Sequence, residues 1–348
     1  MRAVNKKRPV TDERGRRKNA ASRARKLAEK KADSMPAVAP LDGPRLVRHV
    51  PGPLVDPAPS GGIREVLSQR YLLKLIVGRE LAQMYAASLL GLLWSYVQPA
   101  VRFGTYYLVF AVILDAHRSV PDFAVHMFTG QVFVHLFSET WSGGTRSIWQ
   151  NRSLVLKMRM PREIFPVAAF VVALYHTFPQ ILLLVFWCFM TGWHPGLSSL
   201  AAGALGVAIL VTFGLALSLF FAAFNVFFRD FQNIVATILS FLHFMVPMMY
   251  AFSLVYNLKA SQAWMYNIYV GNPLAEGVIL MQKCFWFSSL SPSEHHGNTV
   301  SQAGGPRTIA FPPDMWERGV IMLLICFVLL YAGQKYFARV EGRFPERL

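Results

Sequence analysis

The chain has 348 residues, of which 54% are hydrophobic and only 16% are charged, and its mean hydropathy is +0.35. This composition excludes an ordinary soluble domain of the same size and predicts an all-α integral membrane protein. The formal net charge is +16, from 35 Lys+Arg and 19 Asp+Glu. Since each ion in hydrocarbon costs several kcal/mol, this charge has to be segregated from the apolar segments.

The first 62 residues form a basic arm whose composition differs from that of the rest. Residues 1–62 carry 15 Lys+Arg and 6 Asp+Glu, a net +9 that leaves +7 for residues 63–348. Seven prolines lie between Pro36 and Pro59, so we predict a disordered, Pro-rich cytoplasmic arm. It is either a solvated tail or a ligand for anionic membrane lipid, at roughly 1 kcal/mol per basic side chain. No aromatic residue is interleaved with the charges, so nucleic acid is not an expected partner.

Residues 63–86 are predicted to form an amphipathic helix at the membrane interface. Residues 87–348 then form a transmembrane domain with six apolar segments, each near the roughly 20 residues that a helix needs to cross hydrocarbon. The predicted spans are 87–114, 123–143, 164–190, 198–226, 233–256 and 316–337. Basic residues concentrate in the connection 144–163 and in the C-terminal tail. The positive-inside rule therefore predicts a multi-pass protein with both termini in the cytoplasm.

The connection between the fifth and sixth spans, 257–315, is too long for a bare loop. Its apolar part is interrupted by Gly271-Asn272-Pro273, and each half is shorter than a span. We predict short re-entrant helices that dip into the outer membrane face and turn at this tripeptide, with the irregular backbone buried in protein or lining a wet cavity. A seventh span would instead place the basic tail outside, against the charge distribution.

The sequence contains no GxxxxGK[ST], GxGxxG, HExxH or GxSxG motif. We therefore predict no catalytic, cofactor or metal site, and any ATP that drives transport is expected on another chain. Ionisable residues at membrane depth remain functional candidates. They are Arg102, His126, His135, Glu139, His176, His243, Glu276 and Lys283. Two alternatives stay open: a membrane glycosyltransferase that uses Asp115 and Asp122, and a proton-coupled transporter that uses Glu139 and Glu276.

Aromatic residues make up 14% of the chain and gather in two helical stripes at a spacing of four residues. A ring stacks on the C–H face of a sugar without demanding one hydrogen-bond geometry, which suits a sliding polymer, whereas packing or lipid contact is the alternative. The predicted channel residues are Tyr106, Tyr107, Phe110, the first stripe Phe133, Phe137 and Trp141, and the second stripe Phe220, Phe224 and Phe228. Gly214, Ser218 and Ala222 form a small-residue face that predicts a close helix contact.

Five segments, in this order, resemble ABC-2-type permeases that export polysaccharides, the family of O-antigen, teichoic-acid and cell-wall galactan exporters. They are RELAQMYAASLLGLLWSYVQP (79–99), NRSLVLKMRMPREIFP (151–166), NVFFRDFQNIVATILSFLHFMVPMMY (225–250), GNPLAEGVILMQ (271–282) and FARVEGRFPERL (337–348). The resemblance covers residues 63–348. The basic arm departs from the family pattern, and the residues do not decide which glycan is carried.

The resemblance implies the transmembrane subunit of an exporter that moves a lipid-linked polysaccharide outward across the bacterial plasma membrane. It also implies a homodimer that encloses the channel and binds two copies of a separate ATPase, which holds ATP and Mg. The residues implied to couple to that ATPase are Asn151, Arg152, Lys157, Arg159, Pro161, Arg162, Arg229 and Asp230. Arg79 and Arg102 are expected to attract the lipid phosphate. The outer gate maps onto Gly271, Asn272, Pro273 and Glu276.

Overall fold

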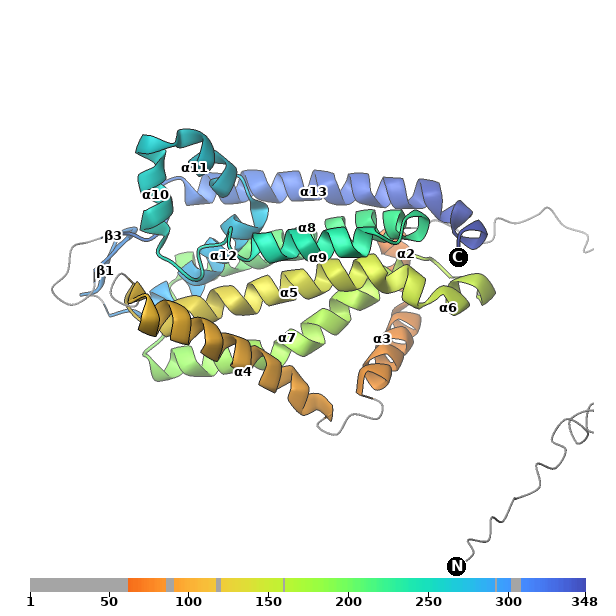
Figure 1. The fold of residues 1–348 in the computed structure, drawn as a ribbon, viewed down its shortest axis with the longest axis horizontal. Coiled ribbons are helices and arrows are strands. Elements are labelled where there is room, and N and C mark those ends of the chain that lie inside the picture. The colour runs from red at the N-terminus through yellow and green to blue at the C-terminus, as the bar shows by residue number, and fades with distance from the viewer. Residues whose placement is uncertain (1–61, 86–90, 117–119, 159, 292, 302–307) are drawn as a thin grey trace, which may run out of the picture. The chain divides into compact units, whose positions relative to one another are not determined.

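The computed structural model describes residues 62–85, 91–116, 120–158, 160–291, 293–301 and 308–348. The predicted arm lies outside these ranges except for Gly62, and so does Arg159 among the predicted coupling residues. The described part is a bundle of helices with one small sheet (Figure 1). The prediction of a predominantly helical membrane protein is confirmed.

The centre of the bundle is α8 (Leu197–Phe227), which packs against α5 (Phe123–Gln150), α12 (Pro273–Cys284) and α13 (Met315–Val340) (Figure 1). A further long helix, α7 (Ile164–Met190), packs along α5. Among the described residues, three helices are long and apolar enough to cross a membrane: α7, α8, and α13 together with the 3₁₀ turn that follows it to Glu346. Their most apolar stretches have mean hydropathies of 1.9, 2.5 and 1.9.

Residues 87–90 of the predicted first span lie outside the described ranges. Its described part starts with the 3₁₀ turn Gly91–Leu93, continues as α4 (Trp94–Tyr106) and ends in a π-helical turn, Tyr107–Ile113. The predicted fifth span, 233–256, is wrong as one continuous helix. Instead α9 (Phe231–Leu242) ends after 12 residues, the chain turns, and α10 (Phe252–Ser261) follows. Pro247 explains the break, because proline has no N–H to donate within a helix. Its carbonyl oxygen accepts a hydrogen bond from Gln282 Nε2 at 2.8 Å, which fixes the turn to α12.

The predicted helix over 63–86 is present as two helices, α2 (Gly62–Ser68) and α3 (Arg70–Tyr85), separated at Gln69. Val66 and Ile76 are buried, in a cluster that also contains residues of α7, α8 and the end of α13. Tyr71 is 82% exposed, and Leu67 and Met84 are also exposed. The two helices therefore pack on the bundle by one face, while their position at a membrane interface stays a prediction.

The predicted turn between short helices is confirmed at Gly271-Asn272-Pro273, where α11 (Ala263–Val270) gives way to α12. Asn272 Oδ1 accepts a hydrogen bond from the backbone N–H of Leu274 at 3.0 Å, and Pro273 occupies the first turn of α12. Both residues favour the start of a helix. After the 3₁₀ turn Phe287–Ser289 and a small unpredicted antiparallel sheet, the chain enters α13. The sheet has the order β1 (His295–His296), β2 (Thr299–Val300), β3 (Thr308–Ile309).

Close helix contacts depend on small residues. A Cβ atom on Gly206 of α8 would lie 2.9 Å from the carbonyl oxygen of Gly277 on α12, so the two backbones approach where glycines face each other. On α5, a Cβ atom at Gly144 would overlap the side chain of Ser218 on α8. The predicted close contact by the small-residue face of the fourth span is thus confirmed within the protomer at Ser218.

Two neighbouring glycines of α5 give a test of this packing. In Gly144→Ala the added methyl group overpacks against Ser218, which we expect to cost about 1–3 kcal/mol of stability. The higher helix propensity of alanine offsets roughly 1 kcal/mol of this cost. Gly143→Ala is the matched control, since its Cβ would meet Ala169 Cβ at an ordinary 3.6 Å. Thermal unfolding of the full chain in detergent measures both. Equal melting temperatures for the two variants would contradict the packing described.

Candidate functional site

Asn151 connects the end of α5 to α3. Its Nδ2 donates to Glu80 Oε1 at 2.9 Å and to the carbonyl oxygen of Ser147 at 3.0 Å, while its Oδ1 accepts from Arg79 Nη1 at 3.2 Å. Asn151 is 3% exposed, and burial raises the pKa of the Glu80 carboxyl against the opposing effects of Asn151 and Arg79. One buried amide thus fixes the angle between two helices.

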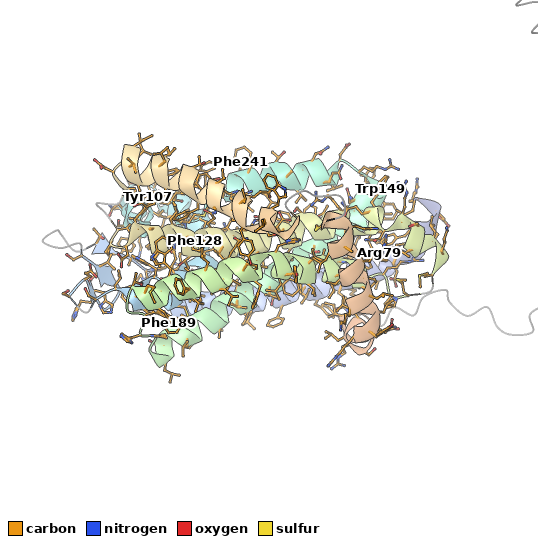
Figure 2. All side chains as sticks on the ribbon, turned by 90° about the horizontal axis from the view of Figure 1, so that it is seen from below. Arg79, Tyr107, Phe128, Trp149, Phe189 and Phe241 are labelled. Atoms are coloured by element: carbon orange, nitrogen blue, oxygen red, sulfur yellow. The ribbon has the colours of Figure 1, made fainter. Side chains whose placement is uncertain are left out.

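Trp149 brings the two predicted coupling segments together. The Cζ atom of Arg152, in α6 (Arg152–Lys157), lies over the Trp149 ring at 4.3 Å from its centroid. The Cζ atom of Arg229, in the turn between α8 and α9, lies over the same ring at 4.5 Å. Such cation–π contacts stabilise by about 0.5–1 kcal/mol each where water has access. Figure 2 shows Trp149 and Arg79 at the same end of the bundle, away from Tyr107 and Phe189.

We call Trp149, Asn151, Arg152, Arg229 and Glu80 the junction. Around it, Lys157 and Asp230 are exposed, whereas Pro161 and Arg162 are buried. Sequence reasoning missed Trp149 and Glu80. Trp149 lies two residues before the segment 151–166 that resembles the export permeases. The signal in the sequence that could have identified it is an aromatic residue close to several arginines.

Arg162 ties the start of α7 to the end of the chain. Its Nη1 donates to the backbone carbonyl oxygen of Glu341, and its guanidinium lies 5.8 Å from the ring centroid of Phe344. The neighbouring Glu163 is fully buried, and burial raises the pKa of its carboxyl. Arg162 therefore supports the fold from inside, so that an incoming partner would meet the exposed basic residues Arg152, Lys157 and Arg229.

The first aromatic stripe lies in the protomer core. Phe133 stacks on Phe285 at 5.9 Å between centroids, Phe137 stacks on Phe213 at 5.2 Å, and Trp141 meets Phe221 edge-on at 5.3 Å. All three stripe residues are buried. In this structure they pack helices together inside the bundle, and their role in a channel stays a prediction.

The second stripe lies at the edge of the core. Phe224 stacks on Tyr336 of α13 at 4.9 Å and meets Phe231 of α9 at 5.1 Å. Phe228 is 64% exposed. Phe220 and Tyr107 reach the surface, and Tyr106 and Phe110 are half-buried. Unlike those of the first stripe, Phe220, Phe228 and Tyr107 are therefore exposed at the surface of the bundle.

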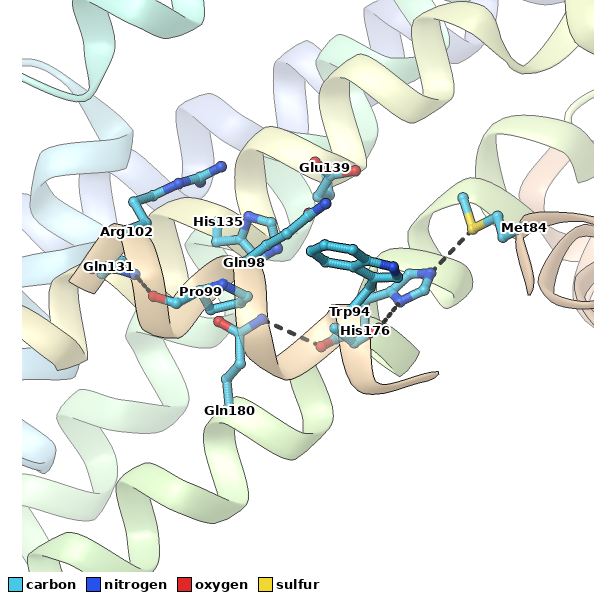
Figure 3. Close-up of a pocket in the computed structure, with 11 residues that line it drawn as sticks. Met84, Trp94, Gln98, Pro99, Arg102, Gln131, His135, Glu139, His176 and Gln180 are labelled. Carbon is cyan, nitrogen blue, oxygen red and sulfur yellow. Dashed lines mark hydrogen bonds between the residues drawn. The ribbon is translucent and has the colours of Figure 1, made fainter. Parts of the chain in front are cut away.

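The structure does not bring the two predicted phosphate attractors into one site. Arg79 contacts Asn151 at the end of α5, whereas Arg102 lines a cavity that Glu139 of α5 also lines (Figure 3). These two α5 positions are 12 residues apart, or about 18 Å along a helix. A single phosphate group cannot bridge that distance.

At the other end of the bundle, the predicted gate residues lie at the start of α12. Glu276 is fully buried, and neither of its carboxylate oxygens has a hydrogen-bond partner among the described residues. The Glu276 position is close to α13, where Arg318 donates to Asp314 Oδ2 at 2.5 Å. The predicted gate thus contains a carboxyl held inside the protein and a turn capped by Asn272.

The fold and the junction define an integral membrane subunit with exposed basic residues at one end of its bundle. No protein-family model matches the chain. It is 30% identical to the O-antigen export system permease protein RfbA of Myxococcus xanthus over 236 residues, which is 67% of this chain and 86% of that protein. Two proteins of the same name from Klebsiella pneumoniae are 26% identical over 223 residues (63% and 82%) and 24% identical over 280 residues (80% and 95%). The chain belongs to the ABC-2-type polysaccharide export permeases.

The hydrogen bonds of the Asn151 amide can be tested by a substitution that introduces a charge. Asn151→Asp keeps an acceptor for Arg79 but places a carboxylate against Glu80, and we expect it to cost about 2 kcal/mol of stability. Adding Glu80→Gln should restore the pair, because the glutamine amide donates to the new aspartate. Thermal unfolding in detergent measures both variants, with Asn257→Asp, at an exposed position on α10, as the control.

The same variant has a defined pH dependence. Two adjacent carboxylates bind a proton more readily in the folded chain than in the unfolded one, so their pKa is raised and the deficit shrinks as the pH falls. The measurement compares the loss of stability in Asn151→Asp at about pH 8 with that at about pH 5, which approaches the pKa range of carboxyl groups. The same loss at both pH values would show that Glu80 does not face residue 151.

Proposed function

We propose that the chain is the transmembrane subunit of an ATP-driven exporter that moves a lipid-linked polysaccharide from the cytoplasmic side outward. The observation that carries the proposal is the match to a protein named as an O-antigen export permease along 86% of its length. The exporter would sit in the bacterial plasma membrane as a multi-pass homodimer with both termini cytoplasmic. Two copies of a separate ATPase, which holds ATP and Mg, would bind at the cytoplasmic end.

The junction supplies a route for the ATPase cycle into the bundle. A partner pressing on Arg152, Lys157 or Arg229 acts on α5 and on the start of α9 together, because both arginines contact Trp149. From there α5 leads to the core, where it packs on α7 and α8. A movement at one end is therefore passed to the other end by packed helices rather than by loops.

The channel wall would come from rings that reach the protomer surface. Tyr107 in the π-helical turn after α4, Phe220 on α8 and Phe228 just after α8 meet this condition. The glycosyltransferase and proton-coupled alternatives gain nothing from the relatives, whose printed names are those of export permeases.

Purification tests the proposal that this chain forms the transmembrane path while a separate chain hydrolyses ATP. Pulled from cells by an affinity tag, the chain should bring with it an ATPase that is a separate polypeptide. The purified chain alone should hydrolyse no ATP, and activity should appear when the ATPase is added. ATP hydrolysis by the chain alone, in a preparation free of the ATPase, would refute the proposal. Cells depleted of the chain should lose surface polysaccharide and accumulate it inside.

Coupling through the junction is tested at Trp149 and its two arginines. We expect Arg229→Ala and Trp149→Leu each to lower permease-stimulated ATP hydrolysis and export about fivefold, the equivalent of one lost cation–π contact of roughly 1 kcal/mol. Arg229→Lys should restore only part, because lysine keeps the charge but loses the planar group. Arg343→Ala removes an exposed arginine outside the junction and serves as the control. If Trp149→Leu supports wild-type ATP hydrolysis and export, the Trp149 ring does not couple the ATPase to the bundle.

A further inference from the structure

A cavity of about 510 Å³ lies at the end of the bundle away from the junction, where the loop between α7 and α8 meets the end of α12 and β1. Figure 2 shows Phe189 at this end, two residues before Thr191, the first residue that lines the cavity. In the proposed orientation this end faces outward. At roughly 30 Å³ for each water in the liquid, the volume equals about 17 waters. The proposed export function assigns no role to this cavity.

The loop before α8 is fixed to the end of α12. Trp193 Nε1 donates a hydrogen bond to the carbonyl oxygen of Cys284 at 2.9 Å. A Cβ atom on Gly203 would lie 2.7 Å from Cys284 Sγ, and Gly206 meets Gly277 further along the two helices. These two contacts show that α8 and α12 run antiparallel. The residues before Gly203 therefore face the end of α12 and the residues that follow it.

Lys283, near the end of α12, brings a positive charge to the cavity. Its Nζ atom lies 4.4 Å from the ring centroid of Phe287 and 5.1 Å from that of Phe311, and both rings are buried. The rings hold the ammonium group in place, but within the described part of the chain it forms no ion pair and donates no hydrogen bond. An ammonium group has three N–H donors. A half-buried lysine without an acceptor points to a ligand with negatively charged oxygens.

The start of α8 supplies further donors to the same cavity, which Gly196, Ser198 and Ser199 line. Gly196 precedes the first turn, and no side chain caps the helix there. Ser199 is only 7% exposed, yet its hydroxyl group has no hydrogen-bond partner among the described residues. The backbone amides of a first helical turn also lack partners within the helix, and the helix dipole favours an anion at this end. An anion on the cavity would accept from both kinds of donor.

The other titratable groups determine where an anion would lie. His194 and His295 also line the cavity, and each imidazole donates a hydrogen bond in its neutral or its charged form. No acidic residue is among the described lining residues. The carboxylate of Glu294 accepts from the hydroxyl group of Ser291 at 2.7 Å and from its amide at 3.0 Å. Ser291 lines the cavity, so Glu294 repels an anion at this rim and favours a position between Lys283 and the start of α8.

Exposed apolar side chains flank the cavity on both sides of the loop. They are Phe189 and Met190 at the end of α7 and Leu197 at the start of α8. Such side chains are suited to hydrocarbon, whereas the serine and histidine side chains beside them are suited to water. In a bilayer this change of character falls at the headgroup region, where the phosphate groups of lipids lie.

We propose that this cavity binds one phosphate group between Lys283 and the start of α8. A phospholipid headgroup and free phosphate supply the same chemistry, in which negatively charged oxygens accept charge-assisted hydrogen bonds from several donors at once. The bound group would offset the charge of Lys283 and connect α8 to α12, the helix that begins at the predicted gate. The proposal goes beyond the export function and does not depend on the glycan carried.

The test titrates inorganic phosphate into the full chain in a non-ionic detergent, with isothermal titration calorimetry at constant ionic strength. We expect saturable binding. Lys283→Met removes the charge and should weaken binding about tenfold, and Ser199→Ala removes one donor and should weaken it about threefold. Glu294→Gln keeps an acceptor for Ser291 but removes the opposing charge, so it should strengthen binding.

Two variants serve as matched controls. Lys259 on α10 also lies over two rings, with Nζ 5.7 Å from the centroids of Tyr256 and Tyr266, but it does not line the cavity. Ser218 on α8 also has a hydroxyl group without a partner among the described residues, but it is fully buried away from the cavity. Lys259→Met and Ser218→Ala should bind phosphate as the wild type does. Thermal unfolding checks that every variant is folded.

Three results would overturn the proposal. They are the absence of saturable phosphate binding, an equal loss of affinity in Lys259→Met and Lys283→Met, and wild-type affinity in both Lys283→Met and Ser199→Ala. Binding to the isolated chain requires neither the ATPase nor export, so the phosphate test and the export test fail separately.

The source of the phosphate group is identified in lipid nanodiscs. The affinity for inorganic phosphate is compared between discs of phosphatidylcholine alone and discs that also contain phosphatidylglycerol. A lower affinity in the second discs would identify the headgroup of an anionic phospholipid as the occupant, because the lipid then competes for the cavity. Equal affinity in the two would identify free phosphate.

Discussion

The close packing of α8 against its neighbours is the contact on which the rest of the structure depends. In hydrocarbon, apolar side chains gain little by leaving lipid for protein, so helices associate where small residues let their backbones approach. Gly206 meets Gly277 of α12, and Ser218 meets Gly144 of α5. These two contacts hold α12 and α5 on the same central helix. The ends of α5 and α8 are thereby brought together, and Trp149 comes within reach of Arg229.

The same packing separates rigid from peripheral elements. α5 and α8 bury many of their side chains, and the first aromatic stripe fills the space between them and α12. By contrast, none of the described side chains of α4 is fully buried, and α9 buries only Val235 and Leu239. Since a helix with few buried contacts is free to shift at low cost, α4 and α9 are the elements that can move against the core.

Much of the fold was predictable from the sequence, because apolar length and basic loops reflect the membrane directly. The helical class and the turn at Gly271-Asn272-Pro273 follow from such local patterns. The break after Leu242 does not, since the residues beyond it are as apolar as those before it and only Pro247 marks the change. Trp149 was missed because its role depends on Arg229, which lies far away in the chain and which no local pattern identifies as its partner.

The two aromatic stripes also show that a local sequence pattern does not determine which side chains are buried. Both have the same spacing, yet Phe137 is buried against Phe213 while Phe228 is 64% exposed. Spacing fixes the helix face on which a ring lies, whereas the neighbouring helices decide whether that face is covered. The face that the core covers cannot meet a substrate without separating helices. The peripheral elements leave more of their rings uncovered, as Trp94 of α4, which is 44% exposed, shows.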